Sequence, residues 1–300
     1  MRSLRSLAPA VAVLAALTLS SCGSSDDKAD AKAEPTPTRT AEEKHTIEVT
    51  YDEPLEGPGE AYVATLAAAE GKTAQALAEE ILKAGEVDGI AEGFADAFKL
   101  PEDLKIHVSN EDGSPYYDPT TKTVTIFYDF ANLTANIIKL SQTGSDGSSI
   151  DDTELGKQWA AVNDFILIHE IAHAFVDVLE IPVTGREEDS ADGMATWFFT
   201  DFVDNGAEYA FAAAQFFSAL QDYQGSPDAT QFADEHSLSI QRAVDIACKV
   251  AGASDENMQI MNQIGFVPAA RLQRCPGEYE QMHNAWTKLL EPHRRDADEG

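Results

Sequence analysis

The chain has 300 residues, among them 52 acidic and 21 basic side chains, which give a formal net charge of −31 at pH 7. The negative electrostatic field of such a protein makes nucleic acid and anionic lipid surfaces poor partners. It is compatible with a neutral or cationic peptide substrate, although acidity of this kind also simply promotes solubility.

The first 21 residues predict an export signal. Arg2 and Arg5 precede an apolar run from residue 7 to 19, which is too short for an ordinary membrane-spanning helix. The run ends in Leu-Ser-Ser before Cys22 and resembles the bacterial lipobox, whose cysteine is lipidated and becomes the new N-terminus. We therefore expect an exported lipoprotein, anchored through Cys22 on the extracytoplasmic side of a membrane. A plain signal peptide with an incidental cysteine is the alternative.

The composition divides the remaining chain into a tether and one domain. After Cys22, residues up to 44 are mostly Ser, Asp, Lys, Ala, Glu, Pro and Thr, so residues 22–44 should form a disordered tether. Residues 45–293 contain no second low-complexity break, which predicts a single domain with a substantial core. Residues 294–300 then form a C-terminal tail.

The first half of the domain predicts a small sheet with flanking helices. Apolar residues alternate with polar ones at residues 47–51, 104–108 and 123–128, and the last two strands form a pair joined by a long polar connection. An edge of this sheet could accept an extended peptide as an added strand, or it could have no binding role. Helical patterns occur at residues 60–83, 87–98 and 131–140, the last followed by a Gly/Ser/Asp loop.

The strongest chemical signal is the H-E-I-A-H motif from His169 to His173, inside an apolar stretch that predicts one helix over about residues 153–180. Positions four apart lie on the same face of a helix, so the two imidazoles can bind one metal ion. Zinc takes about four ligands, and catalytic sites leave one position to water. Glu170 is then placed beside the metal to take the proton of that water.

The third ligand is expected on the next helix. The metzincin extension would place Gly and His where the chain has Val176 and Leu179, which excludes that class. Glu188 and Asp192 lie four apart after Gly-Arg-Glu, and this resembles the gluzincin arrangement. The resemblance implies that Glu188 is the third zinc ligand and that Asp192 holds the first histidine through its other nitrogen. Asp189 is the main rival for the ligand, and the alternative is that Glu187 and Asp189 simply complement the helix dipole.

Two cysteines remain once Cys22 is set aside. An even pair in an exported protein favours a disulfide, so we predict a bond between Cys248 and Cys275 that contributes roughly 3 kcal/mol. Two unpaired buried thiols are the alternative.

The oxyanion of the reaction also needs a partner. Zinc peptidases of this type commonly place a His, Tyr or Arg opposite the metal, because negative charge develops there in the transition state. His236, with Asp234 close in sequence, and Arg242 are the candidates. Alternatively, His236 caps the helix over residues 237–251, and Arg242 pairs structurally with a carboxylate, for example within residues 187–189.

The order of these motifs resembles a bacterial putative metallopeptidase family of exported, largely uncharacterised proteins. The resemblance implies an α+β, mostly helical, zincin-like domain with a small sheet packed on the metal-binding helix. Members often carry a cysteine pair on the two strands before that helix, which this chain lacks. The likeness is carried by H-E-I-A-H, G-R-E-E-D-S-A-D at 185–192, D-E-H-S-L at 234–238, Gln241-Arg242, Ile246-Ala247-Cys248, Arg271, Cys275, Glu278-Tyr279 and Trp286.

These features together predict a zinc metallopeptidase with one zinc per chain and a peptide or protein substrate. His169, His173 and Glu188 would hold the metal, and Glu170 would act as general base. The alternative is a non-catalytic lipoprotein that keeps zinc for structure or for binding a partner. An intact Glu170 favours the enzyme, because a purely structural zinc site does not need a base.

Overall fold

The computed structural model describes residues 44–53, 86–143 and 150–295. The predicted export signal, the predicted lipidation site Cys22, almost all of the predicted tether and the predicted helix at residues 60–83 lie outside the described residues. The same holds for residues 144–149 of the Gly/Ser/Asp loop and for residues 296–300.

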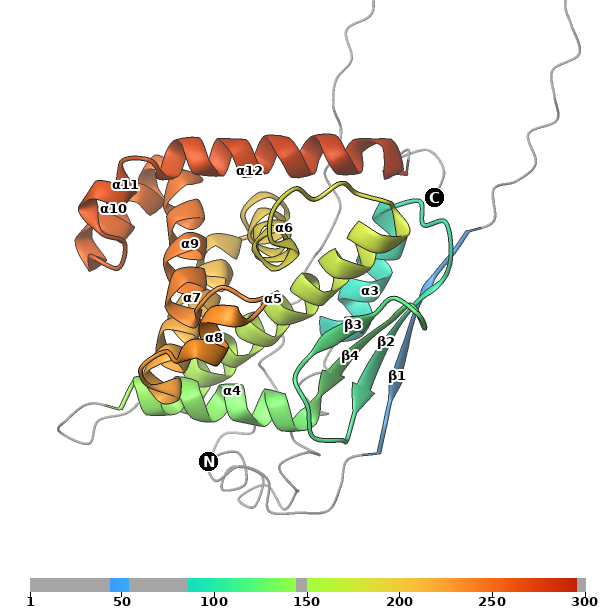
Figure 1. Cartoon of the computed structure of the whole chain (residues 1–300), viewed down its shortest axis with the longest axis horizontal. Coiled ribbons are helices and arrows are strands. Elements are labelled where there is room, and N and C mark those ends of the chain that lie inside the picture. Colours follow the sequence, from blue (N-terminus) through green and yellow to red (C-terminus); the bar gives the residue numbers. More distant parts are fainter. Residues whose placement is uncertain (1–43, 54–85, 144–149, 296–300) are drawn as a thin grey trace, which may run out of the picture.

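The described residues form the predicted small sheet on one side of a larger helical part (Figure 1). All three predicted strands are present, and a fourth, β3, lies within the stretch expected to be only a connection. β3 pairs antiparallel with β4 and turns the chain back, so β4 runs parallel to β2. In sheet order the strands are β1 (Ile47–Tyr51), β2 (Leu104–Ser109), β4 (Thr123–Phe127) and β3 (Tyr116–Asp118).

Helices make up most of the described chain, so the class is α+β and mostly helical, as predicted. The predicted helices at residues 87–98 and 131–140 are present, and the second is longer than expected. The helices are α3 (Glu86–Ala97), α4 (Tyr128–Ser141), α5 (Asp152–Val178), α6 (Glu187–Phe202), α7 (Gly206–Gln224), α8 (Ala229–Ala233), α9 (Ser239–Gly252), α10 (Asp255–Ile264), α11 (Ala269–Leu272) and α12 (Cys275–Leu290), followed by a 3-10 turn (Glu291–His293).

Helix α5, which carries H-E-I-A-H, runs diagonally through the centre of the molecule (Figure 1). Its apolar residues are spread around the whole helix rather than along one face, which is typical of a helix buried on all sides. Phe165, Ile168 and Phe175 are fully buried, and α5 packs on α4, α6, α7 and strands β3 and β4. Glu180, with a φ of 52°, turns the chain away after the helix, and Pro182 prevents its continuation.

The edge strand is tied to the C-terminal end of α5 by a small polar cluster. The Tyr117 hydroxyl donates to Asp177 Oδ2 at 2.7 Å, and Lys122 Nζ donates to the same oxygen at 2.6 Å. Because Tyr117 lies on β3 and Lys122 lies just before β4, both strands of the hairpin are fixed to the metal-motif helix. The cluster therefore sets the position of the sheet edge relative to that helix.

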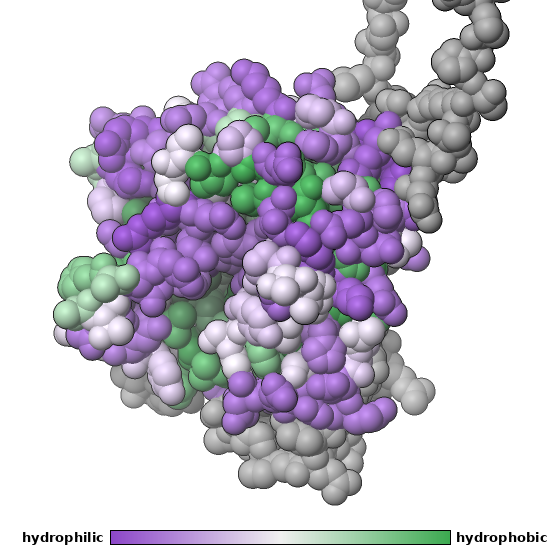
Figure 2. Space-filling model, turned by 45° about the vertical axis from the view of Figure 1, so that its right-hand side comes forward, coloured by the Kyte–Doolittle hydropathy of each residue, from purple (hydrophilic) through white to green (hydrophobic). Residues whose placement is uncertain are grey.

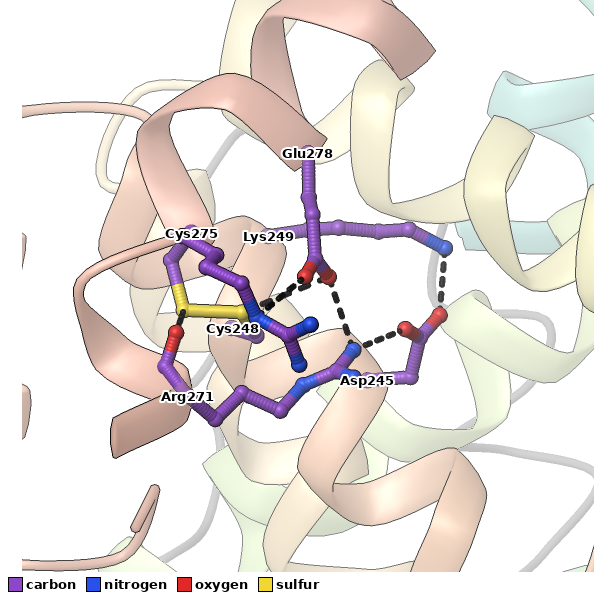
Figure 3. The surroundings of a disulfide bond; sticks show 7 residues. Asp245, Cys248, Lys249, Arg271, Cys275 and Glu278 are labelled. Atoms are coloured by element: carbon purple, nitrogen blue, oxygen red, sulfur yellow. Dashed lines mark hydrogen bonds and ion pairs between the residues drawn. A yellow bond between two sulfur atoms is a disulfide. The ribbon is translucent and has the colours of Figure 1, made fainter. Parts of the chain in front are cut away.

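The predicted disulfide joins Cys248 on α9 to Cys275 at the start of α12 (Figure 3). Both cysteines are fully buried. Beside them, Arg271 Nη2 donates to Asp245 Oδ1 at 2.7 Å and to Glu278 Oε2 at 2.8 Å, which adds a polar link between the same two helices. The crosslink closes a loop of 27 residues, for which roughly 3 kcal/mol of stabilisation is expected. It therefore fixes α9 on α12.

The ordered contacts continue slightly past the expected end of the domain. Arg294 forms an isolated bridge with Phe98, and Arg295 Nε donates to the Ala95 carbonyl at 3.1 Å. Residues 294 and 295 therefore pack on the C-terminal end of α3.

The face of the molecule shown in Figure 2 is predominantly polar. Hydrophilic residues cover most of the face in Figure 2, and apolar residues gather mainly in recesses between them. Within the described part of the chain, no helix is both long and apolar enough to span a bilayer.

Candidate metal centre

Three potential metal ligands from two neighbouring helices meet at one point. His169 and His173 on α5 place their Nε2 atoms 3.3 Å apart. Glu188, in the first turn of α6, reaches both rings: its Oε2 lies 3.0 Å from His169 Nε2 and its Oε1 lies 3.4 Å from His173 Nε2. The packing of α5 against α6 thus brings together the three residues that were predicted from the sequence as metal ligands.

The spacing and chemistry of these donors fit a zinc ion. Tetrahedral coordination with bonds of 2.0–2.1 Å places neighbouring ligand atoms about 3.3 Å apart. The two ring nitrogens are 3.3 Å apart, and the Glu188 carboxylate lies 3.0 Å from one through Oε2 and 3.4 Å from the other through Oε1. Two imidazoles and a carboxylate are also a common ligand set of catalytic zinc.

A fourth protein ligand does not complete this set among the residues that the structure describes. His169, His173 and Glu188 group together as one candidate set, whereas His236 groups with Glu188 and Glu235 in a second one. Three protein donors leave a coordination position for water, as in catalytic sites, whereas structural zinc sites are usually closed by four protein ligands.

The remaining ring nitrogens of both histidines are bound by carboxylates of α6. His169 Nδ1 donates to Asp192 Oδ1 at 2.9 Å, and His173 Nδ1 donates to Glu187 Oε1 at 2.7 Å. Burial by itself would lower the pKa of His169, but its hydrogen bonds to Asp192 and Glu188 raise it. The carboxylates therefore favour positive charge at the centre of the cluster, which a metal cation supplies.

Arg242 binds Asp192 rather than facing the metal ligands. Its Nε donates to Asp192 Oδ2 at 2.8 Å and its Nη2 donates to Oδ1 at 2.7 Å, while the guanidinium lies 3.9 Å above the Phe217 ring. Burial by itself would raise the pKa of Asp192, but Arg242 and His169 hold it well below its usual range. The expected structural pairing of Arg242 is thus observed, with Asp192 as its partner instead of a residue in 187–189.

Glu170 lies beside the ligands without belonging to the set. Its side chain is 6% exposed, and burial raises the pKa of its carboxyl against the lowering effect of His169 and His173. A carboxylate with a raised pKa is a better base near neutral pH.

His236 lies at the open side of the cluster, in the loop between α8 and α9. Its Nε2 is 3.0 Å from Glu188 Oε2, and its Nδ1 is 3.0 Å from Asp234 Oδ1. The Asp234 carboxylate also accepts from the His236 backbone N–H, so the ring and its backbone are held together. The side chain of His236 remains 43% exposed, which leaves it accessible to a bound substrate.

The first turn of α6 also holds this loop. Arg186 Nη1 donates to the His236 carbonyl at 2.9 Å, and the Ser237 hydroxyl donates to Asp189 Oδ1 at 2.7 Å. From the sequence, Glu187 and Asp189 were expected to complement the helix dipole or to pair with Arg242, and Asp189 was also the rival metal ligand. The contacts of Arg186, Glu187 and Asp189 depend on how α5, α6 and the loop meet, and the only sequence signal for them was the unusual density of charge in this turn.

Comparison with known proteins places the chain in a family. A family model described as "Putative metallopeptidase" matches residues 67–290, about three quarters of the chain. The chain belongs to this family. No match was found among the curated proteins or among the solved structures. Membership of the family supports a hydrolase that acts on peptides or proteins and uses a metal ion, and His169, His173 and Glu188 are a set that could bind one.

Proposed function

We propose that the protein is a zinc-dependent peptidase with a zincin-like catalytic domain. The observation that carries the proposal is the set of two ring nitrogens and one carboxylate, separated by 3.0 to 3.4 Å, with the buried Glu170 next to it. His169, His173 and Glu188 would hold the ion. When bound, zinc supplies Lewis acidity and lowers the pKa of a water molecule to about 7.

The protein side chains perform the proton transfers of this mechanism. Glu170 accepts a proton from the attacking water and later gives it to the leaving amine of the cleaved peptide. His236 would stabilise the oxyanion that forms as water adds to the peptide carbonyl, with its Nε2–H turned from Glu188 Oε2 toward that oxygen. The hydrogen bond to Glu188 raises the pKa of His236, which helps to keep that proton on the ring.

Arg242 acts as a positioning residue in this proposal. Its bidentate bond to Asp192 fixes the carboxylate that in turn holds His169. The Arg242 side chain is 12% exposed and is bound to Asp192 by two hydrogen bonds, whereas the His236 side chain is 43% exposed, so His236 is the better candidate for the oxyanion partner. We therefore propose His236, and not Arg242, as the oxyanion partner.

Metal content of the purified full-length chain tests the proposal. We expect about one zinc per chain by elemental analysis, lost in both His169→Ala and Glu188→Ala because two donors hold zinc poorly. His107→Ala removes a histidine of β2 that bonds to Thr50, and it should retain the zinc. Absence of metal from the wild type after zinc is supplied would overturn the proposal. Bound zinc without hydrolysis of a peptide library would instead favour the non-catalytic lipoprotein.

We also propose that the protein is an exported lipoprotein, anchored through lipid on Cys22. The lipobox-like residues before Cys22 and the polar segment after it support this proposal. When bacterial cells that produce the protein are fractionated, Cys22→Ser should appear in the soluble fraction. The wild type and the control variant Ser25→Ala should appear in the membrane fraction. If mass spectrometry of the wild-type protein showed an N-terminal peptide without lipid, the result would contradict lipidation.

A further inference from the structure

The two histidines of the metal centre are held in different ways. His169 donates to Asp192, which is 3% exposed and bound by Arg242, whose side chain is 12% exposed. His173 donates to Glu187 at 2.7 Å, and the side chain of Glu187 is 46% exposed. One histidine therefore has a buried partner with its own counter-charge, and the other has a partner at the mouth of the site.

We propose that Glu187 is a positioning residue for the metal ligand His173. It fixes the orientation of the ring and keeps the proton on Nδ1, so that the lone pair of Nε2 is available to the metal. This inference rests on the proposed function, and it assigns Glu187 a role beyond that of an acid at a helix N-terminus.

The chemistry of the contact supports this role. A neutral imidazole carries one N–H, and an ionised carboxylate can only accept a hydrogen bond. A carboxylate at Nδ1 therefore selects the form of the ring that has its lone pair on Nε2, and it also makes that nitrogen more basic. The Nε2 of His173 is the atom that lies 3.3 Å from His169 Nε2 and 3.4 Å from Glu188 Oε1.

The position of Glu187 in α6 explains why it can reach the ring. Glu187 and Glu188 are consecutive residues of the first helical turn, so their side chains leave the helix in different directions. The ring of His173 lies between them, with Glu188 at Nε2 and Glu187 at Nδ1. The start of α6 therefore holds His173 from both of its nitrogens.

The zinc dissociation constant of the full-length chain, measured by competition with a chromophoric chelator, tests the inference. Glu187→Ala should weaken zinc binding by about 10- to 100-fold, as expected on loss of a hydrogen-bonded partner of a metal ligand. Glu187→Gln keeps an oxygen that accepts from Nδ1, and it should restore most of the affinity. Asp189→Asn is the matched control, since it removes a charge from the same helical turn but contacts Ser237, and it should bind zinc as the wild type does.

Three results would overturn the inference. Zinc affinity that is unchanged in Glu187→Ala would show that the contact does not act on the metal centre. An equal loss in Glu187→Gln would indicate that charge rather than the hydrogen bond matters, and an equal loss in Asp189→Asn would indicate a general effect of the helix N-terminus. Tight zinc binding by the wild type in these experiments leaves the proposed function intact, whereas no zinc binding by the wild type would overturn both.

Discussion

Glu170→Gln should lower the turnover of a peptide substrate by about 10²- to 10⁴-fold while zinc remains bound, because general-base catalysis of this kind contributes that much to the rate. Glutamine has nearly the same shape as glutamate but cannot take a proton from water. Glu170 is not one of the three predicted metal ligands, so the substitution should change the affinity for zinc only slightly. Turnover and zinc content measured on the same preparation test both parts of the expectation.

Glu154→Gln provides the matched control for this variant. Glu154 lies on the same helix, near its start, where it accepts a hydrogen bond from Gln158. The same substitution there should leave turnover unchanged. Wild-type turnover in Glu170→Gln would remove Glu170 as the base, and loss of zinc would show that its carboxylate helps to hold the metal.

Asp192→Ala should lower the free energy of unfolding by roughly 3–5 kcal/mol, because it leaves the buried charge of Arg242 without its partner. The same change should weaken zinc binding by about 10- to 100-fold, because His169 loses the carboxylate at Nδ1. Denaturant unfolding of the metal-depleted protein and zinc titration measure the two effects separately.

The double variant Asp192→Ala/Arg242→Met separates the two roles of Asp192. Replacing both members of a buried ion pair is far less destabilising than removing one of them, so much of the stability should return. Zinc affinity should stay low, since His169 still lacks its partner. Recovery of zinc affinity together with stability would show that Asp192 affects the metal only through the fold.

Local sequence patterns were sufficient for three strands, for helices α3, α4 and α5 and for the central motif. The spacing of His169 and His173 places both rings on one face of any helix, whatever surrounds it. The continuous apolar stretch around them predicted a buried helix, and α5 spans Asp152–Val178. Alternation of apolar residues predicted three of the four strands, and the even cysteine pair predicted the disulfide between Cys248 and Cys275. The fourth strand, β3, was not predicted, because three residues are too few to show an alternation of apolar and polar side chains.

Only the tertiary structure decided which side chains meet. The periodicity of an element fixes which residues share a face, but it does not say which other element that face contacts. Arg242 and Asp192 are 50 positions apart, and their pairing depends on α9 packing beside α6. The contacts of Glu187 with His173 and of Glu188 with His236 likewise depend on where α5, the start of α6 and the loop before α9 meet. The sequence by itself therefore determined the metal motif and its helix, because that spacing is local. The resemblance implied Glu188 and Asp192, but the other partners around the motif were decided by the packing of the helices, because those contacts join residues distant in the chain.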